Sequence, residues 1–214
     1  MIDAGHSALA VTRRPREFPF TDPQLTVAGA DVRDESTLAG LTDGADAVVS
    51  TIGVPFTRQP VDTFSIGTRN IVTAVRHTGT QRLVVVSSTG AYSYPHRQNA
   101  SLSLRIFGPL IARTLGKTVY DDTHRMETIV HNSGLDWTIV RPSILFDLPH
   151  RTYYTAGQVE PIGAFTARID LAHYLTTLAS DPTAIHKTVI ISTTEHVPTF
   201  WQNMRRQSFK PAHG

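Results

Sequence analysis

Hydroxyl-bearing side chains cluster directly after a strongly apolar segment, and they are the first candidates for chemistry in this sequence. Ser87 and Ser88 follow three consecutive valines, and Tyr92 comes four residues later. Ligands of open α/β sheets bind in the crevice outside the carboxyl ends of the strands. Nothing near the serines supplies the base that a nucleophilic serine needs, so hydrogen bonding to a ligand is the expected role. A serine that merely ends a strand is the alternative.

Two adjacent arginines end another short apolar segment. Arg13 and Arg14 follow residues 8–12, and no acidic residue accompanies them there. A guanidinium is planar, permanently charged and able to bind a phosphate through paired hydrogen bonds. At the end of a nucleotide-binding strand, an acidic residue would instead bind a free ribose 2′-hydroxyl. The pair predicts a 2′-phosphate site and favours NADPH over NADH, with an exposed basic turn as the alternative.

Two further segments place candidate residues after apolar runs. Gly53 follows Thr51 and Ile52 at the end of one run, where a glycine lets the backbone approach a ligand closely. A plain turn glycine is the alternative. Asp31 and Val32 follow another run, and Asp31 is also a candidate N-cap for a helix that starts near residue 35.

These candidates require an alternation of strands and helices. The predicted strands are residues 8–12, 25–28, 47–51, 82–87, 137–141 and 188–192. The predicted helices span about residues 64–78 and 170–178, and a third has Met126, Ile129 and Val130 on its inner face and stops at Ser133-Gly134. A helical excursion is expected over 98–116. The valine- and isoleucine-rich strands are typical of burial on both faces. The sequence predicts a Rossmann-like, doubly wound α/β fold with a mostly parallel sheet and helices on both faces.

The chain length and composition indicate one globular domain. We expect that domain over residues 1–198, with an aromatic substrate-side lobe at 142–164 and a loose tail at 199–214. The chain has 40% hydrophobic residues, a net charge of +2 and no cysteine. It shows no apolar run of bilayer length, no basic cluster for nucleic acid and no histidine pattern for a metal. We expect a cytoplasmic monomer or homodimer that binds a small molecule.

Four segments together resemble the atypical short-chain dehydrogenase/reductases, in particular the NmrA-like and biliverdin-IXβ/flavin reductase-like proteins. They are residues 11–15, 30–32, 65–72 and 121–137, within a likeness that covers about residues 4–195. The resemblance implies NAD(P)H binding, with Asp31 and Val32 at the adenine and Ser88 as the active-site serine beside the nicotinamide. The cofactor-binding residues that we expect are Arg13, Arg14, Asp31, Val32, Thr51, Ile52, Gly53, Ser87 and Pro142. The expected acceptor pocket consists of Tyr92, Phe107, Tyr153 and Tyr154.

The sequence departs from the resemblance at three places. Tyr120 and His124 resemble the Tyr-x-x-x-Lys motif of short-chain dehydrogenases, but the register from the helix end puts Tyr120 one residue out, about 100° around the helix. A structural or surface role is therefore expected for Tyr120. No histidine follows Pro142, which argues against biliverdin as the substrate.

The third departure lies at the amino end. The first strand and the glycine-rich phosphate-binding turn are expected ahead of residue 8, which leaves the predicted fold incomplete there. The neighbouring strands at 8–12 and 47–51 would then pair directly, accept a strand from another chain, or belong to a protein that begins roughly 20 to 25 residues upstream. We expect the last.

The sequence thus predicts an NAD(P)H-dependent oxidoreductase that passes hydride to a planar conjugated molecule such as a flavin or quinone. One alternative is a non-catalytic, NADP-sensing NmrA-like regulator, which the absent Tyr/Lys pair suits. The other is a degenerate Rossmann-like protein that binds no dinucleotide and acts as an isomerase or lyase.

Overall fold

A computed structural model of the chain describes residues 1–94, 116–157, 161–199 and 202, and its main sheet has the strand order β3-β4-β5-β9-β7. The bounds of these strands are β3 (Ala47–Ser50), β4 (Arg82–Val86), β5 (Asp136–Pro142), β9 (Lys187–Thr193) and β7 (Tyr154–Gly157). All neighbouring pairs are parallel except β7 with β9, which is antiparallel. A mostly parallel sheet places the carboxyl ends of its parallel strands along one edge.

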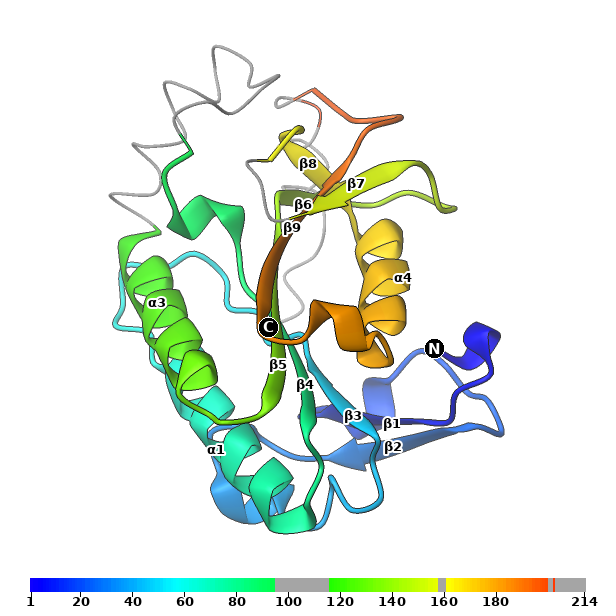
Figure 1. Cartoon of the computed structure of the whole chain (residues 1–214), viewed down its shortest axis with the longest axis vertical. Coiled ribbons are helices and arrows are strands. Elements are labelled where there is room, and N and C mark those ends of the chain that lie inside the picture. Colours follow the sequence, from blue (N-terminus) through cyan, green and yellow to red (C-terminus); the bar gives the residue numbers. More distant parts are fainter. Residues whose placement is uncertain (95–115, 158–160, 200–201, 203–214) are drawn as a thin grey trace.

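Helices cover both faces of this sheet, as Figure 1 shows. Helices α1 (Thr63–Thr78) and α3 (Lys117–His131) pack against one face, and α4 (Arg168–Ala179) packs against the other. Alternate residues of β4 divide between the two cores, since Leu83 and Val85 face α1 and α3 while Val84 faces α4. The Rossmann-like doubly wound fold is therefore confirmed.

The predicted strands and the predicted ends of the helices agree closely with the structure, and α3 begins at Lys117. Each of the six predicted strands is present, with its ends within one residue of the prediction. Helix α1 ends at Gly79, whose φ of 80° is the left-handed conformation that a glycine C-cap adopts. The turn after α3 uses Gly134 in the same conformation, with φ of 68°. The glycines in the sequence were therefore sufficient to locate these ends.

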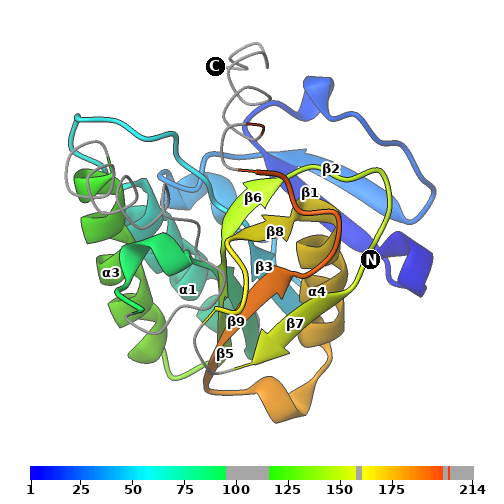
Figure 2. The same ribbon diagram turned by 90° about the horizontal axis from the view of Figure 1, so that it is seen from above.

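The segment predicted as an irregular lobe, residues 142–164, contains two short strands, β6 (Ile144–Phe146) and β7, and a third, β8 (Phe165–Ala167), follows it directly. Strand β7 joins the edge of the main sheet, while β6 and β8 form a separate parallel pair (Figure 2). The rings of Phe146 and Phe165 meet edge to face at 6.1 Å and form a small core there. Strands of three or four residues are too short to show the alternation on which sequence-based prediction depends.

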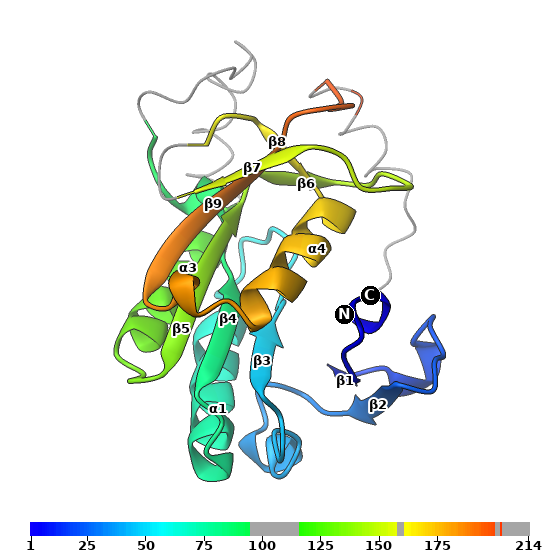
Figure 3. The same ribbon diagram turned by 45° about the vertical axis from the view of Figure 1, so that its right-hand side comes forward.

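Strands β1 (Ala8–Thr12) and β2 (Leu25–Gly29) form a second, two-stranded parallel sheet. Figure 3 shows this pair standing apart from β3. Among the described residues, β1 and β3 do not pair with each other, so direct pairing, the first of the three outcomes considered above, is not what the structure shows. Leu9 and Val11 of β1 are each 41% exposed, unlike the valines of β4.

Helix α1 provides contacts between the two sheets. The turn η3 (Glu35–Leu38), which follows β2, packs against α1. The Nδ2 of Asn70 donates to the carbonyl oxygen of Val32 at 2.9 Å. Within the described residues, no helix is both long and apolar enough to cross a membrane. The helical excursion predicted at 98–116 and the tail at 199–214 lie almost wholly outside the described residues.

Candidate functional site

Val32 and Ile52 lie side by side because a glycine of α1 lets both approach. A Cβ at Gly67 would lie 2.9 Å from Cγ2 of Val32 and 3.1 Å from Cδ1 of Ile52. Asn70, one turn further along α1, is buried and holds the carbonyl of Val32. The ends of β2 and β3 therefore meet on the same stretch of helix, although they belong to different sheets.

Thr51 and Gly53 border open space next to this contact. Both residues are exposed, and among the described residues, apart from the two chain neighbours, no heavy atom lies within 4 Å of the position of a Cβ at Gly53. A glycine with nothing beside it is not needed for packing within the chain. The space that it leaves accords with a ligand passing close to the backbone at the end of β3.

Asp31 stabilises the loop that follows β2. Its Oδ1 accepts a hydrogen bond from the backbone N–H of Arg33 at 3.0 Å, and its own backbone N–H and carbonyl both bond the hydroxyl of Thr37. The N-cap of η3 is Asp34, whose carboxylate accepts from the backbone N–H of Ser36. The alternative interpretation of Asp31 as the helix cap is therefore wrong.

The two arginines after β1 are both exposed. Arg14 makes a long, 3.5 Å contact with Glu17, and 44% of its side chain is exposed. Such a surface contact contributes little to stability, so the guanidinium can exchange it for another anion. Arg13 is exposed immediately beside it. The predicted phosphate-binding pair is thus accessible to a ligand.

A buried carboxylate organises the ends of β4 and β5. Glu127 of α3 is 3% exposed, and four hydrogen bonds reach it from three side chains. Arg141 at the end of β5 donates from Nε to Oε1 at 3.0 Å and from Nη2 to Oε2 at 2.6 Å. Tyr92 donates its hydroxyl to Oε2 at 2.6 Å, and Ser87 donates to Oε1. All four acceptor positions of the carboxylate are filled.

The charges within this cluster stabilise each other. Burial alone would raise the pKa of Glu127, but the hydrogen bonds from Arg141, Ser87 and Tyr92 bring it below the ordinary value. Burial and the hydrogen bond to Glu127 raise the pKa of the Tyr92 hydroxyl strongly. The guanidinium carbon of Arg141 lies 3.4 Å from the centroid of the Tyr92 ring. Glu127 is therefore ionised and Tyr92 neutral near neutral pH.

Ser88 and Tyr120 both lie close to Gly90. The Oγ of Ser88 accepts from the backbone N–H of Gly90 at 3.0 Å, and a Cβ at Gly90 would lie 2.3 Å from the Tyr120 hydroxyl and 3.3 Å from that Oγ. Burial raises the pKa of Tyr120. The register argument predicted a structural or surface position for Tyr120. The structure brings its hydroxyl next to Gly90, in the loop of residues 87–93 that follows β4.

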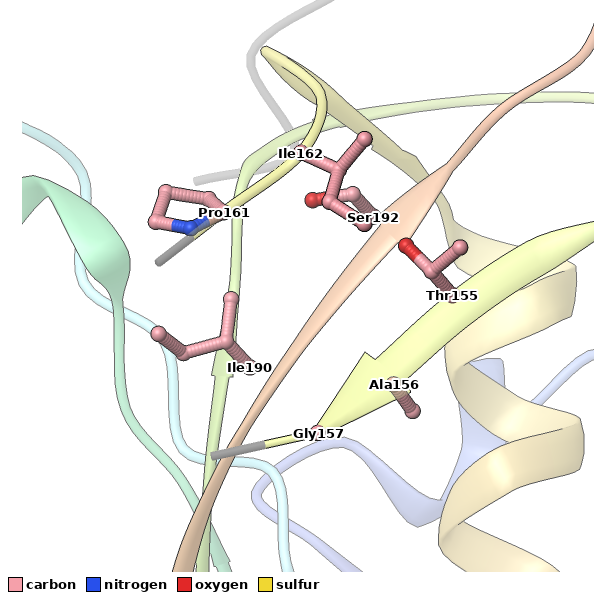
Figure 4. A pocket seen from close by; sticks show the side chains of 7 residues that line it. All are labelled: Thr155, Ala156, Gly157, Pro161, Ile162, Ile190 and Ser192. Carbon is pink, nitrogen blue, oxygen red and sulfur yellow. The ribbon is translucent and has the colours of Figure 1, made fainter. Parts of the chain in front are cut away.

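A small pocket lies on the same face of the sheet as Arg141. Arg141 and Ile190 are register partners on β5 and β9, so their side chains share a face. Ile190 lines the pocket together with Thr155, Ser192 and the segment at 161–162, as Figure 4 shows. The pocket therefore begins one strand away from the Glu127–Arg141 pair.

The predicted aromatic pocket is only partly assembled. Tyr92 lies at the site, but Tyr153 is 75% exposed, and Tyr154 packs on the opposite face against Tyr174 and bonds His173. Phe107 lies outside the described residues. Pro142 is buried at the end of β5. The prediction that Tyr154 faces the acceptor is therefore wrong, because its place in the alternation of β7 directs it towards α4.

Glu127 and Arg141 were not among the predicted site residues. The signal was available, because Glu127 follows Met126 on the buried face of α3 and Arg141 ends an otherwise apolar strand. Charged residues at such positions are rarely buried unless they are paired. The sequence could not show that they pair with each other. Among the described residues, no group of three metal-binding side chains comes together.

Comparisons with known proteins agree with this architecture. Residues 1–182 match a family described as NAD(P)H-binding. An uncharacterized chloroplastic protein of Arabidopsis thaliana is 32% identical over 138 residues, which are 60% of this chain and 45% of that protein. Cinnamoyl-CoA reductase 1 of Petunia hybrida is 30% identical over 109 residues, 45% of this chain and 32% of that enzyme. The chain thus spans less than half the length of either relative.

Solved structures share the fold at low sequence identity. A short-chain dehydrogenase/reductase of Veillonella parvula, in complex with NADP, has a TM-score of 0.69 at 17% identity, with 91% of this chain and 87% of that chain covered. The anaerobillin reductase ChuY of Escherichia coli O157:H7 has a TM-score of 0.68 at 20% identity, covering 92% and 89%. A protein of Lactobacillus casei has a TM-score of 0.71 at 18% identity, covering 91% of both chains.

Proposed function

Because this chain belongs to the NAD(P)H-binding family, we propose that it is an NADPH-dependent oxidoreductase whose acceptor is a planar conjugated small molecule such as a flavin or quinone. The observation that carries the proposal is the cluster around Glu127 at the ends of β4 and β5. It provides fixed hydroxyls and an arginine at the position where open α/β sheets bind their ligands.

The nucleotide would lie along the strand ends. Arg13 and Arg14 are exposed and would hold the 2′-phosphate, and Val32 and Ile52 would form an apolar contact for the adenosine half. The open space beside Gly53 leaves room for the chain of the cofactor to pass. When bound, a reduced nicotinamide supplies a hydride.

The acceptor end needs positioning more than acid catalysis. Ser88 would orient a ligand by hydrogen bonding, and Tyr92 would contribute its ring to the wall of the site. The strongly raised pKa of Tyr92 makes it a poor proton donor, so solvent supplies the proton. Reduction of a conjugated acceptor depends mainly on stacking and exclusion of water.

A fluorescence titration of the purified protein with NADPH and NADH tests the nucleotide assignment. We expect micromolar NADPH binding that weakens about tenfold or more in Arg13→Ala, because a charge-assisted hydrogen bond of about 1.5–3 kcal/mol is lost. NADH binding should change little. Arg16→Ala removes the same charge from the neighbouring exposed turn η2 (Pro15–Glu17) and should leave both affinities unchanged.

Turnover separates an enzyme from a sensor. NADPH oxidation followed at saturating flavin or quinone should accelerate over the protein-free rate. No NADPH binding would refute the nucleotide assignment. Steady binding without consumption across the panel would refute the reductase activity and favour the regulatory alternative.

A further inference from the structure

Whether Ser87 donates or accepts its side-chain hydrogen bond is determined by its partner, Glu127. An ionised carboxylate has no proton to give, so the hydrogen between Ser87 and Glu127 must be that of the serine. Arg141 carries only donors, so it cannot take that hydrogen instead. Glu127 is 3% exposed and fully bonded, which fixes this arrangement in the resting protein.

The Ser87 oxygen is therefore left with acceptor capacity alone. Its backbone N–H is already bonded to the carbonyl of Val140, and the residue is half-buried at the end of β4, the edge at which open α/β sheets bind ligands. Tyr92 also donates to Glu127, but Arg141 lies over its ring and bonds its oxygen. Among the described residues, no group donates to the Ser87 oxygen, so of these two hydroxyls Ser87 is the one that keeps lone pairs for a ligand.

We propose that Ser87 selects a ligand group that carries an N–H or O–H donor and disfavours a bare carbonyl at that position. This inference rests on the proposed function and narrows its substrate class. A flavin offers a ring imide N–H and a nicotinamide offers a carboxamide N–H, whereas a simple quinone offers only carbonyl oxygens. Opposing lone pairs repel, so a carbonyl placed against Ser87 leaves the oxygen unsatisfied.

Glu127 acts through Ser87 and is a positioning residue. In Glu127→Gln an NH2 group with two N–H donors replaces one carboxylate oxygen, and a donor beside Ser87 allows the Ser87 hydrogen to turn towards the crevice. The variant should therefore lose the preference for donor-bearing ligands without losing the ability to bind planar rings. A merely structural role for Glu127 would weaken the binding of all ligands alike.

Dissociation constants for matched ligand pairs test the inference. One arm compares riboflavin with 3-methylriboflavin, which lacks the imide N–H. The other compares NADPH with its 3-acetylpyridine analogue, in which a methyl group replaces the carboxamide NH2. We expect a loss of about fivefold or more in one arm, the size of one hydrogen bond, and that arm identifies the source of the donor.

Three variants, at Ser87, Glu127 and Ser93, complete the test. Ser87→Ala should abolish the difference in the affected arm, and Glu127→Gln should reduce or reverse it. Ser93→Ala, the same change at an exposed position of the same loop, should preserve it. Nucleotide binding with equal ratios in wild type and Ser87→Ala would overturn the inference and leave the proposed function intact. Absence of binding by all four ligands would overturn both.

Discussion

At the scale of single residues, the cluster around Glu127 has a large energetic consequence. A buried ion pair is weak evidence for stability when both partners are considered together, but removal of one partner leaves the other charge buried without compensation. Arg141 has only 16% of its side chain exposed, so it cannot regain full hydration if Glu127 is lost. Ser87 and Tyr92 would lose their acceptor in the same step.

Glu127→Ala should therefore lower the free energy of unfolding by about 3–5 kcal/mol, measured by urea denaturation. Asp121→Ala provides a control on the same helix, because Asp121 pairs with Lys117 on the exposed surface. Its loss should cost less than about 1 kcal/mol. Similar costs for the two variants would show that the buried pair is not held as the structure indicates.

The same carboxylate predicts how stability depends on pH. The pKa of Glu127 is lower in the folded protein than in the unfolded chain, where an unperturbed glutamate has a pKa of about 4.3. Its contribution is fully present above that value and is lost as the pH falls through the lowered folded pKa. Glu127→Gln should flatten the acid limb of a stability profile measured between about pH 2 and 6. A limb with unchanged slope would contradict the assignment.

At the scale of elements, the approach of α1 to the ends of β2 and β3 depends on one glycine. Gly67→Ala gains about 1 kcal/mol of helix propensity, but the new Cβ overlaps Val32 and Ile52, which costs about 1–3 kcal/mol. The net result should be a loss of stability of about 1 kcal/mol, the difference between these terms. Thermal denaturation measures it.

Gly53→Ala is the matched comparison. The same methyl group enters open space, so stability should change by less than about 0.5 kcal/mol. NADPH affinity should nevertheless fall, because the added carbon occupies room that we assign to the ligand. Unchanged affinity would place the nucleotide elsewhere.

The sequence was sufficient to predict the elements that have a regular apolar pattern and a residue, such as glycine, that marks their end. The strands at β1 and β4 were predicted because their apolar runs are uninterrupted, and α1 because Gly79 ends it. Strands β6 and β8 were missed because three residues carry no usable pattern. Ion pairs between side chains of different elements could not be predicted either. The contact between Glu127 and Arg141 depends on how α3 is rotated against β5.

At the scale of the whole molecule, the strands belong to two separate sheets. Among the described residues, β1 bonds only β2, and β3 bonds only β4. Strands β4 and β5 are central and bonded on both edges, so they should open only on global unfolding. Strands β1 and β2, with Leu9 and Val11 exposed, should open locally.

Hydrogen exchange should resolve this difference. Backbone amides of β1 and β2 that are bonded in the parallel pair should exchange by at least about tenfold faster than those of β4 and β5, which corresponds to a stability difference of about 1.4 kcal/mol or more. Mass spectrometry of peptides from each pair gives the comparison. Equal protection in both sheets would mean that they unfold as one unit.

The separation of the sheets gives any long ligand a mechanical role. A molecule that reaches from Arg13 after β1 to Ser87 after β4 would span two bodies whose described contacts run through α1. Such a molecule would hold the two sheets together, and its binding free energy would appear as added stability of the β1–β2 sheet, which opens more easily. A shorter molecule that occupies only the serine end would lack that effect, even at equal affinity. Binding of a ligand and stabilisation of the β1–β2 sheet would thus be properties that can be measured separately.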